Sequence, residues 1–337
     1  MPNLDMWRAV AVDPFHNPFS DPTAHYIVWN WLSPFLAWAL KVNGVHSYFY
    51  FHLAFSVAFT AVFIFLVFSQ LDENDARTSL VLFLAIPASS TAYFWVGMDS
   101  VTLFLMLLLL AFRRSLPLVL LFGIALGMQH FEQAFCATAA LTCALLVTSA
   151  FKDKIGYSIR WGITSVAGVV LGKLVLIALV KHYGIHVNSG RAYYLHQYLQ
   201  LILNEFYYHF EYILWSVLGV GWIAAAKLVD NAKRAVPFFI SLFGLMLLLP
   251  VVSDETRVVC IVTFPLFAAY ILLNREFLRS LDGRITASIF GLWILVPWPY
   301  VLGGTPKWSV FPFDIAFLLH KYFGWFNVPT NQPMWPF

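Results

Sequence analysis

The feature that most constrains this chain is a series of long apolar runs, separated by short stretches of charged and turn residues. Charged residues make up 11% of the 337 residues, whereas a soluble domain carries about 25%. A bilayer core of about 30 Å is crossed by a helix of about 20 apolar residues. The sequence therefore predicts an all-α polytopic integral membrane protein.

The apolar runs predict about ten transmembrane helices, at roughly 47–69, 79–96, 98–112, 115–128, 131–151, 158–180, 210–229, 235–252, 257–273 and 285–302. The short runs 98–112 and 115–128 are expected to form a hairpin that does not fully cross, or to lie where the membrane is thin. Residues 25–41 are open to two interpretations, an eleventh span or a surface helix, and Pro34 slightly favours the surface helix.

We expect one membrane-embedded domain over residues 1–337. It consists of an N-terminal loop with a juxtamembrane helix (1–46), a transmembrane bundle (47–302) and an outer interfacial tail (303–337). Mixed aromatic, aliphatic and polar residues at helical spacing predict interfacial helices at 192–209 and 312–325.

The basic residues are unevenly distributed over the loops. If the spans alternate in direction, 12 of the 20 Lys and Arg residues fall in short loops on one side: Arg77, Arg113, Arg114, Lys152, Lys154, Arg160, Lys227, Lys233, Arg234, Arg275, Arg279 and Arg284. The positive-inside rule predicts that this side is cytoplasmic. All ten histidines fall on or near the other side, either because its loops are longer or because it carries a polar site.

The segment DPFHNPFSDPTAHY, residues 13–26, combines Asp13, Asp21 and His25 with several prolines. Proline restricts the backbone and can hold such side chains in place. The acids are candidates for a general base or a metal-binding carboxylate. The alternative is a rigid loop in which each Asp–Pro pair starts a turn.

Two further motifs lie between predicted spans. WVGMDS carries Asp99, and GMQHFEQA carries His130, Glu132 and Gln133. Ionisable residues at membrane depth are costly, which makes them functional candidates. The alternatives are a helix N-cap for Asp99 and a short connecting loop for the second motif.

The segment SDETRVV places Asp254, Glu255 and Arg257 at the start of a span. The planar guanidinium of Arg257 is suited to binding an oxyanion. The alternative is a capped helix with a local Arg–carboxylate pair. Lys173 and Arg191 are weaker candidates for phosphate binding.

Other classes of function have little support. The chain lacks the GxxxxGK[ST], HExxH and GxSxG patterns, and its net charge of +3 is too small to indicate a nucleic-acid partner. No cofactor is required by any motif. A divalent metal bound by outer Asp and His residues stays open, because no ligand spacing demands one.

The segment DPFHNPFSDPTAHY followed by IVWNWLSPFLAWALKVNG resembles the acidic first extracytoplasmic loop of the GT-C superfamily of membrane glycosyltransferases. WVGMDS and DETRV look similar to bacterial members. The resemblance implies a multi-pass protein of the bacterial inner membrane with an extracytoplasmic active side, a polyprenyl-phosphate-sugar donor and a glycan or lipid acceptor. In the family this loop follows a first transmembrane helix, and none precedes Asp13.

The resemblance also implies a mechanism. Arg257, with Arg191 or Lys173, would hold the donor phosphate. Asp21 or Asp13 would remove the acceptor proton, and the sugar would transfer with inversion. Two other classes stay open: a flippase for lipid-linked saccharides or a small-solute transporter, and a non-catalytic membrane subunit. We find no paired repeats of the kind that many transporters contain.

Overall fold

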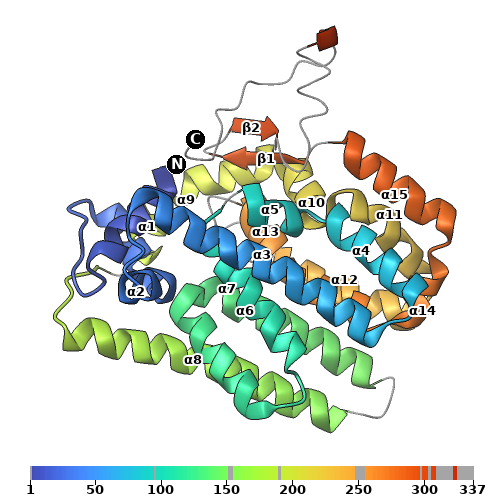
Figure 1. Ribbon diagram of the computed structural model, residues 1–337, viewed down its shortest axis with the longest axis horizontal. Helices are drawn as coiled ribbons and strands as arrows, with labels where there is room; N and C mark the ends of the chain where they lie inside the picture. The colour runs from blue at the N-terminus through green and yellow to red at the C-terminus, as the bar shows by residue number, and fades with distance from the viewer. Residues whose placement is uncertain are drawn as a thin grey trace.

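The computed structural model describes residues 2–94, 96–150, 155–188, 191–246, 255–296, 298–302, 305–308 and 322–324. The elements, most of them labelled in Figure 1, are α1 (Pro2–Val12), the 3-10 helix η1 (Pro22–Trp29), α2 (Leu32–Ala39), α3 (Val45–Gln70), α4 (Glu73–Ala85), α5 (Pro87–Phe94), α6 (Met98–Ala111), α7 (Leu116–Ala150), α8 (Ile155–His182), α9 (Arg191–Tyr208), α10 (Phe210–Leu218), η2 (Gly219–Gly221), α11 (Trp222–Ala226), η3 (Lys227–Asp230), α12 (Ala232–Met246), α13 (Glu255–Leu273), α14 (Arg275–Ser280), α15 (Gly283–Leu295), and the antiparallel strands β1 (Pro299–Leu302) and β2 (Thr305–Trp308).

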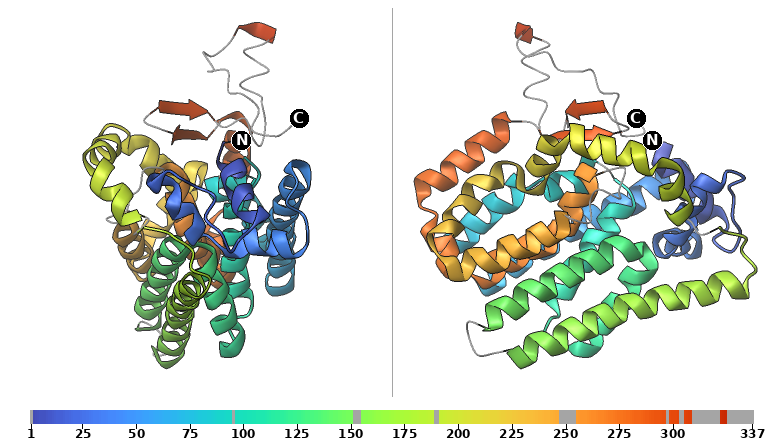
Figure 2. Two further views of the ribbon diagram at one scale, coloured as in Figure 1. Left: turned by 90° about the vertical axis from the view of Figure 1, so that its left-hand side faces the viewer. Right: turned by 180° about the vertical axis from the view of Figure 1, so that it is seen from behind.

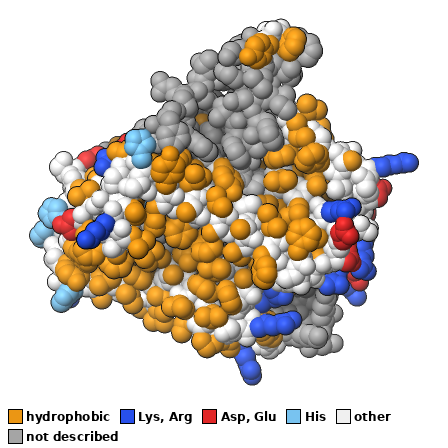
Figure 3. Space-filling view, in the orientation of Figure 1, with side chains coloured by type: hydrophobic (Ala, Val, Ile, Leu, Met, Phe, Trp, Pro, Cys, Tyr) orange, Lys and Arg blue, Asp and Glu red, His pale blue; other side chains and the backbone are white. Residues whose placement is uncertain are grey.

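The chain is predominantly α-helical and has the helices of a membrane protein. Within the described residues, five helical segments are long and apolar enough to cross a bilayer: Val45–Gln70, Leu116–Leu146, Gly156–His182, Phe210–Asp230 and Thr256–Leu273. Shorter apolar helices cover Met98–Ala111, Ala235–Leu245 and Gly283–Leu295. Large apolar side chains such as Phe65 and Ile163 are exposed on these helices, and Figure 3 shows a broad apolar surface. Lipid is the solvent that such a surface needs.

Helix α7 consists of two arms that meet at His130. The backbone of His130 is not helical (φ −160°, ψ 85°), and the chain turns back there, as Figure 1 shows. The hydroxyl of Tyr157, at the start of α8, donates a hydrogen bond to the carbonyl of Arg113, just before the first arm. Both ends of α7 therefore lie at the same end of the molecule. The arms match the predicted runs 115–128 and 131–151.

The first arm of α7 packs closely along α8, which Figure 2 shows as the long helix along the lower edge of the molecule. A Cβ atom built on Gly127 would lie 2.1 Å from the carbonyl oxygen of Val169, and one on Gly172 would lie 2.1 Å from that of Ile124. Small residues four apart let membrane helices approach to backbone contact. Only glycine fits at these positions.

Several predicted segments have different boundaries in the structure. Residues 25–41 do not form the continuous helix that an eleventh span needs, because η1 ends at Trp29 and α2 covers only eight residues. The predicted span 79–96 is divided between α4 and α5 at Pro87, which cannot continue the hydrogen bonding of α4. The predicted span 285–302 ends as a helix at Leu295, before Pro297 and Pro299.

Of the two predicted interfacial helices, residues 192–209 correspond to α9 (Arg191–Tyr208). The exposed aliphatic and aromatic side chains of α9 agree with a place at the membrane surface. The second, residues 312–325, lies outside the described residues apart from 322–324.

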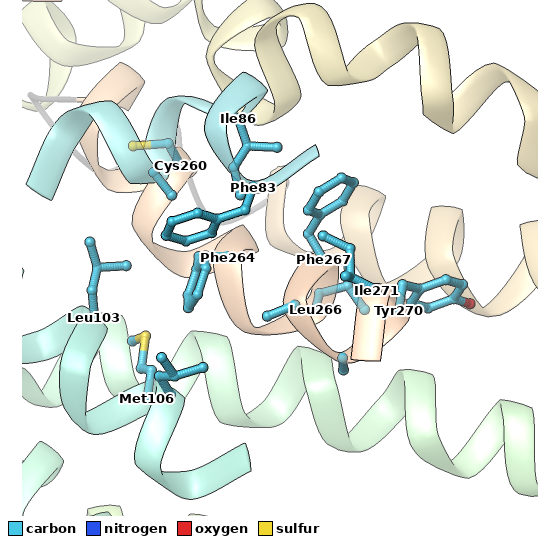
Figure 4. Close-up of a cluster of buried hydrophobic side chains, with 14 of the residues drawn as sticks. Phe83, Ile86, Leu103, Met106, Cys260, Phe264, Leu266, Phe267, Tyr270 and Ile271 are labelled. Atoms are coloured by element: carbon cyan, nitrogen blue, oxygen red, sulfur yellow. The ribbon is translucent and has the colours of Figure 1, made fainter. Parts of the chain in front are cut away.

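The core divides into two clusters of buried apolar side chains. The larger surrounds α13, where Phe264 lies 5.0 Å from Phe59 between ring centroids (Figure 4 shows part of this cluster). The smaller joins α1, η1 and α2 to the start of α3 through residues such as Trp31 and Phe49. The N-terminal segment is thus a packed part of the fold.

The predicted cytoplasmic loops gather at one end of the bundle, which we call the basic end. Arg113 Nη2 lies 3.2 Å from Gln70 Oε1, Arg275 Nη2 lies 2.5 Å from the carbonyl oxygen of Gln70, and Arg279 Nη2 lies 3.2 Å from Asp72 Oδ2. This end includes α14, at the right of Figure 1, while α1 and α2 lie at the left.

Candidate functional site

A buried ion pair joins two of the predicted motifs. Arg257 Nη1, on α13, lies 2.5 Å from Asp99 Oδ2, in the first turn of α6. The side chains of Asp99 and Arg257 are only 3% and 13% exposed. Asp99 is not the N-cap of α6, which is Gly97, and its carboxylate binds a cation from a helix 158 residues away.

The turn of α7 lies beside this pair. Gln129 Oε1 accepts a hydrogen bond from the backbone N–H of Ser33 (2.9 Å), and Gln129 Nε2 donates to the carbonyl of Met98 (3.2 Å). One side chain thus connects the N-terminal segment, α7 and the residue before Asp99. His130 Nδ1 lies 3.6 Å from Glu132 Oε2.

Gln133 follows the turn of α7 and is 3% exposed. Neither its amide nitrogen nor its amide oxygen has a hydrogen-bond partner among the described residues. A buried amide without partners costs free energy, commonly about 1–3 kcal/mol. Such a group needs a polar partner, a water molecule or a ligand, that the described residues do not supply.

Lys173, on α8, contributes a second cation near this turn. Its Nζ lies 4.3 Å from the ring centroid of Trp29 and 5.5 Å from that of Phe131. A cation over an aromatic face is stabilised by about 0.5–2 kcal/mol, more when it is desolvated. We call the set Asp99, Gln129, His130, Gln133, Lys173 and Arg257 the apex site.

Replacing Lys173 by Met is expected to keep most of the packing against Trp29 and to lose the charge. The melting temperature of the purified protein should fall by a few degrees or less, since about 1 kcal/mol is involved. Lys173→Arg should restore it, because a guanidinium also stacks on Trp. A fall for Lys173→Arg as large as for Lys173→Met would contradict the cation–π contact.

The depth of the apex site follows from helix lengths. Fourteen residues of α6 and its turn separate Asp99 from Arg113, which corresponds to about 21 Å. Arg257 is separated from Asn274 by about 25 Å of α13. The site therefore lies about 21–25 Å along the helices from the basic end, which is most of the thickness of a hydrocarbon core of about 30 Å.

The acids Asp13 and Asp21 are exposed in the segment between α1 and η1. Asp13 Oδ1 accepts from the backbone N–H of Phe15 (3.0 Å), and Asp21 accepts from both the hydroxyl (2.6 Å) and the backbone N–H (2.9 Å) of Thr23. These bonds from Thr23 lower the pKa of Asp21 below its usual value. Asp21 also caps η1. The residue therefore has the turn-forming role that the sequence offers as the alternative to catalysis.

The loop with these acids is attached to the apex site. The Trp31 indole Nε1 donates to the carbonyl of Pro14 (2.8 Å), and the Trp31 backbone N–H donates to the carbonyl of Met128 (3.1 Å). His25 Nδ1 accepts from the backbone N–H of Asn188 (3.2 Å), which connects the same loop to the segment that follows α8. His25 thus has a structural role in the loop.

Three predicted site residues are not placed in detail. Arg191 and Glu255 are the first residues of α9 and α13, and nothing is described of their side chains; Asp254 lies outside the described residues. Sequence reasoning missed Gln129, Ser33 and Trp29. For Gln129 a signal existed, because it is part of GMQHFEQA together with His130 and Glu132.

Within the described residues, no group of three or more His, Cys, Asp or Glu side chains is arranged to hold a metal ion. The apex site offers at most the His130–Glu132 pair and Asp99, which already contacts Arg257. Its chemistry is that of cations and amide groups, which bind anionic and polar ligands.

Comparisons of the chain with protein-family models, with curated proteins and with solved structures give no match.

Proposed function

We propose that the protein is a membrane glycosyltransferase that moves a sugar from a polyprenyl-phosphate donor to a glycan or lipid acceptor. The observation that supports this most is the apex site, where two cations and an unpartnered buried amide gather at one bilayer boundary. A lipid phosphate lies at that depth, and cations stabilise a phosphate leaving group. The resemblance of the N-terminal loop to the GT-C superfamily supports the same reaction.

The proposal includes an orientation. By the positive-inside rule the basic end faces the cytoplasm of a bacterial inner membrane, and the apex site faces outward. About ten membrane-embedded segments result when the arms of α7 are counted separately and the shorter apolar helices α6, α12 and α15 and the α4–α5 pair are included.

In this mechanism Arg257 and Lys173 bind the donor phosphate, and Arg191 adds a third cation. Gln133 hydrogen-bonds the sugar or the phosphate. Asp21 or Asp13 removes the proton of the acceptor hydroxyl, which attacks the anomeric carbon as the phosphate leaves with the bonding electron pair.

The substitution Asp21→Asn distinguishes the proposed catalytic role of Asp21 from its role as the cap of η1. Asn caps helices about as well as Asp, so Asp21→Asn should fold normally and lose about 100-fold or more in transfer rate. Transfer is measured with the purified protein in liposomes that contain a panel of radiolabelled polyprenyl-phosphate sugars. The matched control is Asp282→Asn, since Asp282 caps α15 at the opposite end (2.8 Å to the N–H of Ile285).

Full activity of Asp21→Asn, Asp13→Asn and the double variant would exclude both acids as the general base. The second candidate function, a flippase for lipid-linked saccharides, gives a different result in the same liposomes. It would move the labelled lipid between leaflets and leave the sugar–phosphate bond intact.

A further inference from the structure

A large cavity lies at the basic end, remote from the apex site. Its volume is about 1150 Å³. Among the described residues, four cationic side chains line it, Arg113, Arg114, Lys233 and Arg275, and one acidic side chain, Glu276. The lining thus has an excess of positive charge.

Two of these cations are available to a ligand. Arg113 donates to Gln70 and to the carbonyl of Leu110 (3.2 Å), and Arg275 donates to the carbonyl of Gln70. Arg114 and Lys233 are exposed, and neither lies within 4.0 Å of a carboxylate in the described part of the chain.

The surroundings of Arg113 disfavour its charged form, and a bound anion would stabilise that form. Burial lowers the pKa of this guanidinium, Tyr157 opposes that shift, and the charge of neighbouring Arg114 adds to it. A bound anion would offset the repulsion between the two side chains. No carboxylate in the described ion pairs performs this role for Arg113.

Most of the remaining described lining is apolar and belongs to membrane helices, and its polar residues are Ser69, Gln70, Ser115, Asn231 and Asn274. The second arm of α7 contributes Leu141, Ala144 and Leu145, and α13 contributes Leu266, Ala269 and Leu273 among others. A charged rim above an apolar wall matches an amphiphile better than a small water-soluble anion, which gains nothing from the wall. The Lys and Arg side chains in Figure 3 lie mainly at the lower and right-hand edges of the apolar surface, where headgroups would lie.

We propose that this cavity binds an anionic lipid, with its phosphate at Arg114 and Lys233 and a hydrocarbon chain along the wall formed by α7 and α13. The inference goes beyond glycosyl transfer and depends only on the cavity. It assigns the basic end a lipid-binding site of its own.

The test uses the full-length protein, delipidated in a neutral detergent, and native mass spectrometry. Dioleoyl phosphatidic acid is titrated against dioleoylglycerol, which has the same chains without the phosphate, and against inorganic phosphate. The double variant Arg114→Gln/Lys233→Gln is compared with Arg160→Gln/Arg284→Gln. The control removes the same charge from exposed positions at this end that do not line the cavity.

Phosphatidic acid should bind the wild type and the control variant equally, and the cavity variant about tenfold or more weakly. Dioleoylglycerol should bind weakly to all three proteins. Equal affinity of the two double variants would overturn the proposal. Inorganic phosphate that competes at the concentration of the lipid would also overturn it, because the wall would then contribute nothing. Since the readout is binding, either failure leaves the proposed transfer reaction untouched.

Discussion

Asp99→Asn is expected to destabilise the protein by about 3–5 kcal/mol, because the buried charge of Arg257 would lose the carboxylate that it contacts at 2.5 Å. Asn is nearly the same size as Asp, so packing changes little and the effect reports the charge. The free energy of unfolding is measured in detergent micelles or bicelles by a reversible denaturant titration. We also expect transfer activity to be lost, since Arg257 would be mispositioned.

The double variant Asp99→Asn/Arg257→Gln tests whether the pair acts as a unit. Removing both charges should recover a large part of the stability, because no buried charge is left uncompensated. The control is Asp72→Asn, whose partner Arg279 is 62% exposed and lies 3.2 Å away. An exposed pair of this kind contributes about 1 kcal/mol or less. If Asp99→Asn cost no more than Asp72→Asn, the buried pair would not be a stabilising contact.

Gly172→Leu is expected to have the second large effect. The Cβ atom of a side chain at position 172 would lie 2.1 Å from the carbonyl oxygen of Ile124. The first arm of α7 and α8 must therefore move apart. Overpacking of this kind costs about 1–3 kcal/mol and more where backbone must shift. Gly127→Leu should behave in the same way, because its Cβ would lie 2.1 Å from the carbonyl oxygen of Val169.

The same substitution should also affect the apex site. Gly172 precedes Lys173, and Gly127 lies two residues before Gln129, so separating the helices displaces a cation and an amide of the site. Folded Gly172→Leu protein should therefore show reduced transfer. Gly156→Leu, also on α8, is the control, since no atom lies within 4 Å of a Cβ built there. Equal melting temperatures for the two variants would contradict the close packing.

Much of the helical architecture is predictable from the sequence, because lipid requires long apolar helices and charges mark their ends. The runs 47–69 and 158–180 correspond closely to α3 and α8. The run 79–96 shows the limit of this reasoning. It is apolar throughout, but Pro87 divides it, and hydropathy alone does not register a missing backbone donor.

The apex site is only partly predictable. The motifs around Asp99, His130 and Arg257 are each recognisable, because polar groups beside apolar runs are costly and need a reason. Their association is a property of the folded chain: the partners Asp99 and Arg257 are 158 residues apart. Gly123 and Gly127 are four residues apart on α7, and so are Gly168 and Gly172 on α8. Gly123 contacts Gly168 and Gly127 contacts Gly172, so this spacing could have predicted the close contact of α7 and α8.

The structure of the N-terminal segment differs from the predicted loop, because part of the segment is a helix. Its prolines and acids predict a loop, and a loop is present, but Pro2–Val12 forms a helix whose Leu4 and Trp7 are buried. Sequence periodicity over so short a segment is weak, and the stability of α1 comes from its contacts with α2 and α3.

The most direct test of the central claim is mass spectrometry of envelope glycans and lipid-linked sugars in a deletion strain of the source organism. The strain is complemented with wild type, with Asp21→Asn, or with the capping control Asp282→Asn. Our account predicts that one defined sugar disappears from the glycans and returns with wild type and Asp282→Asn but not with Asp21→Asn. Unchanged glycans and unchanged lipid-linked pools in the deletion strain would contradict glycosyl transfer, and accumulation of a complete lipid-linked product would identify a flippase instead.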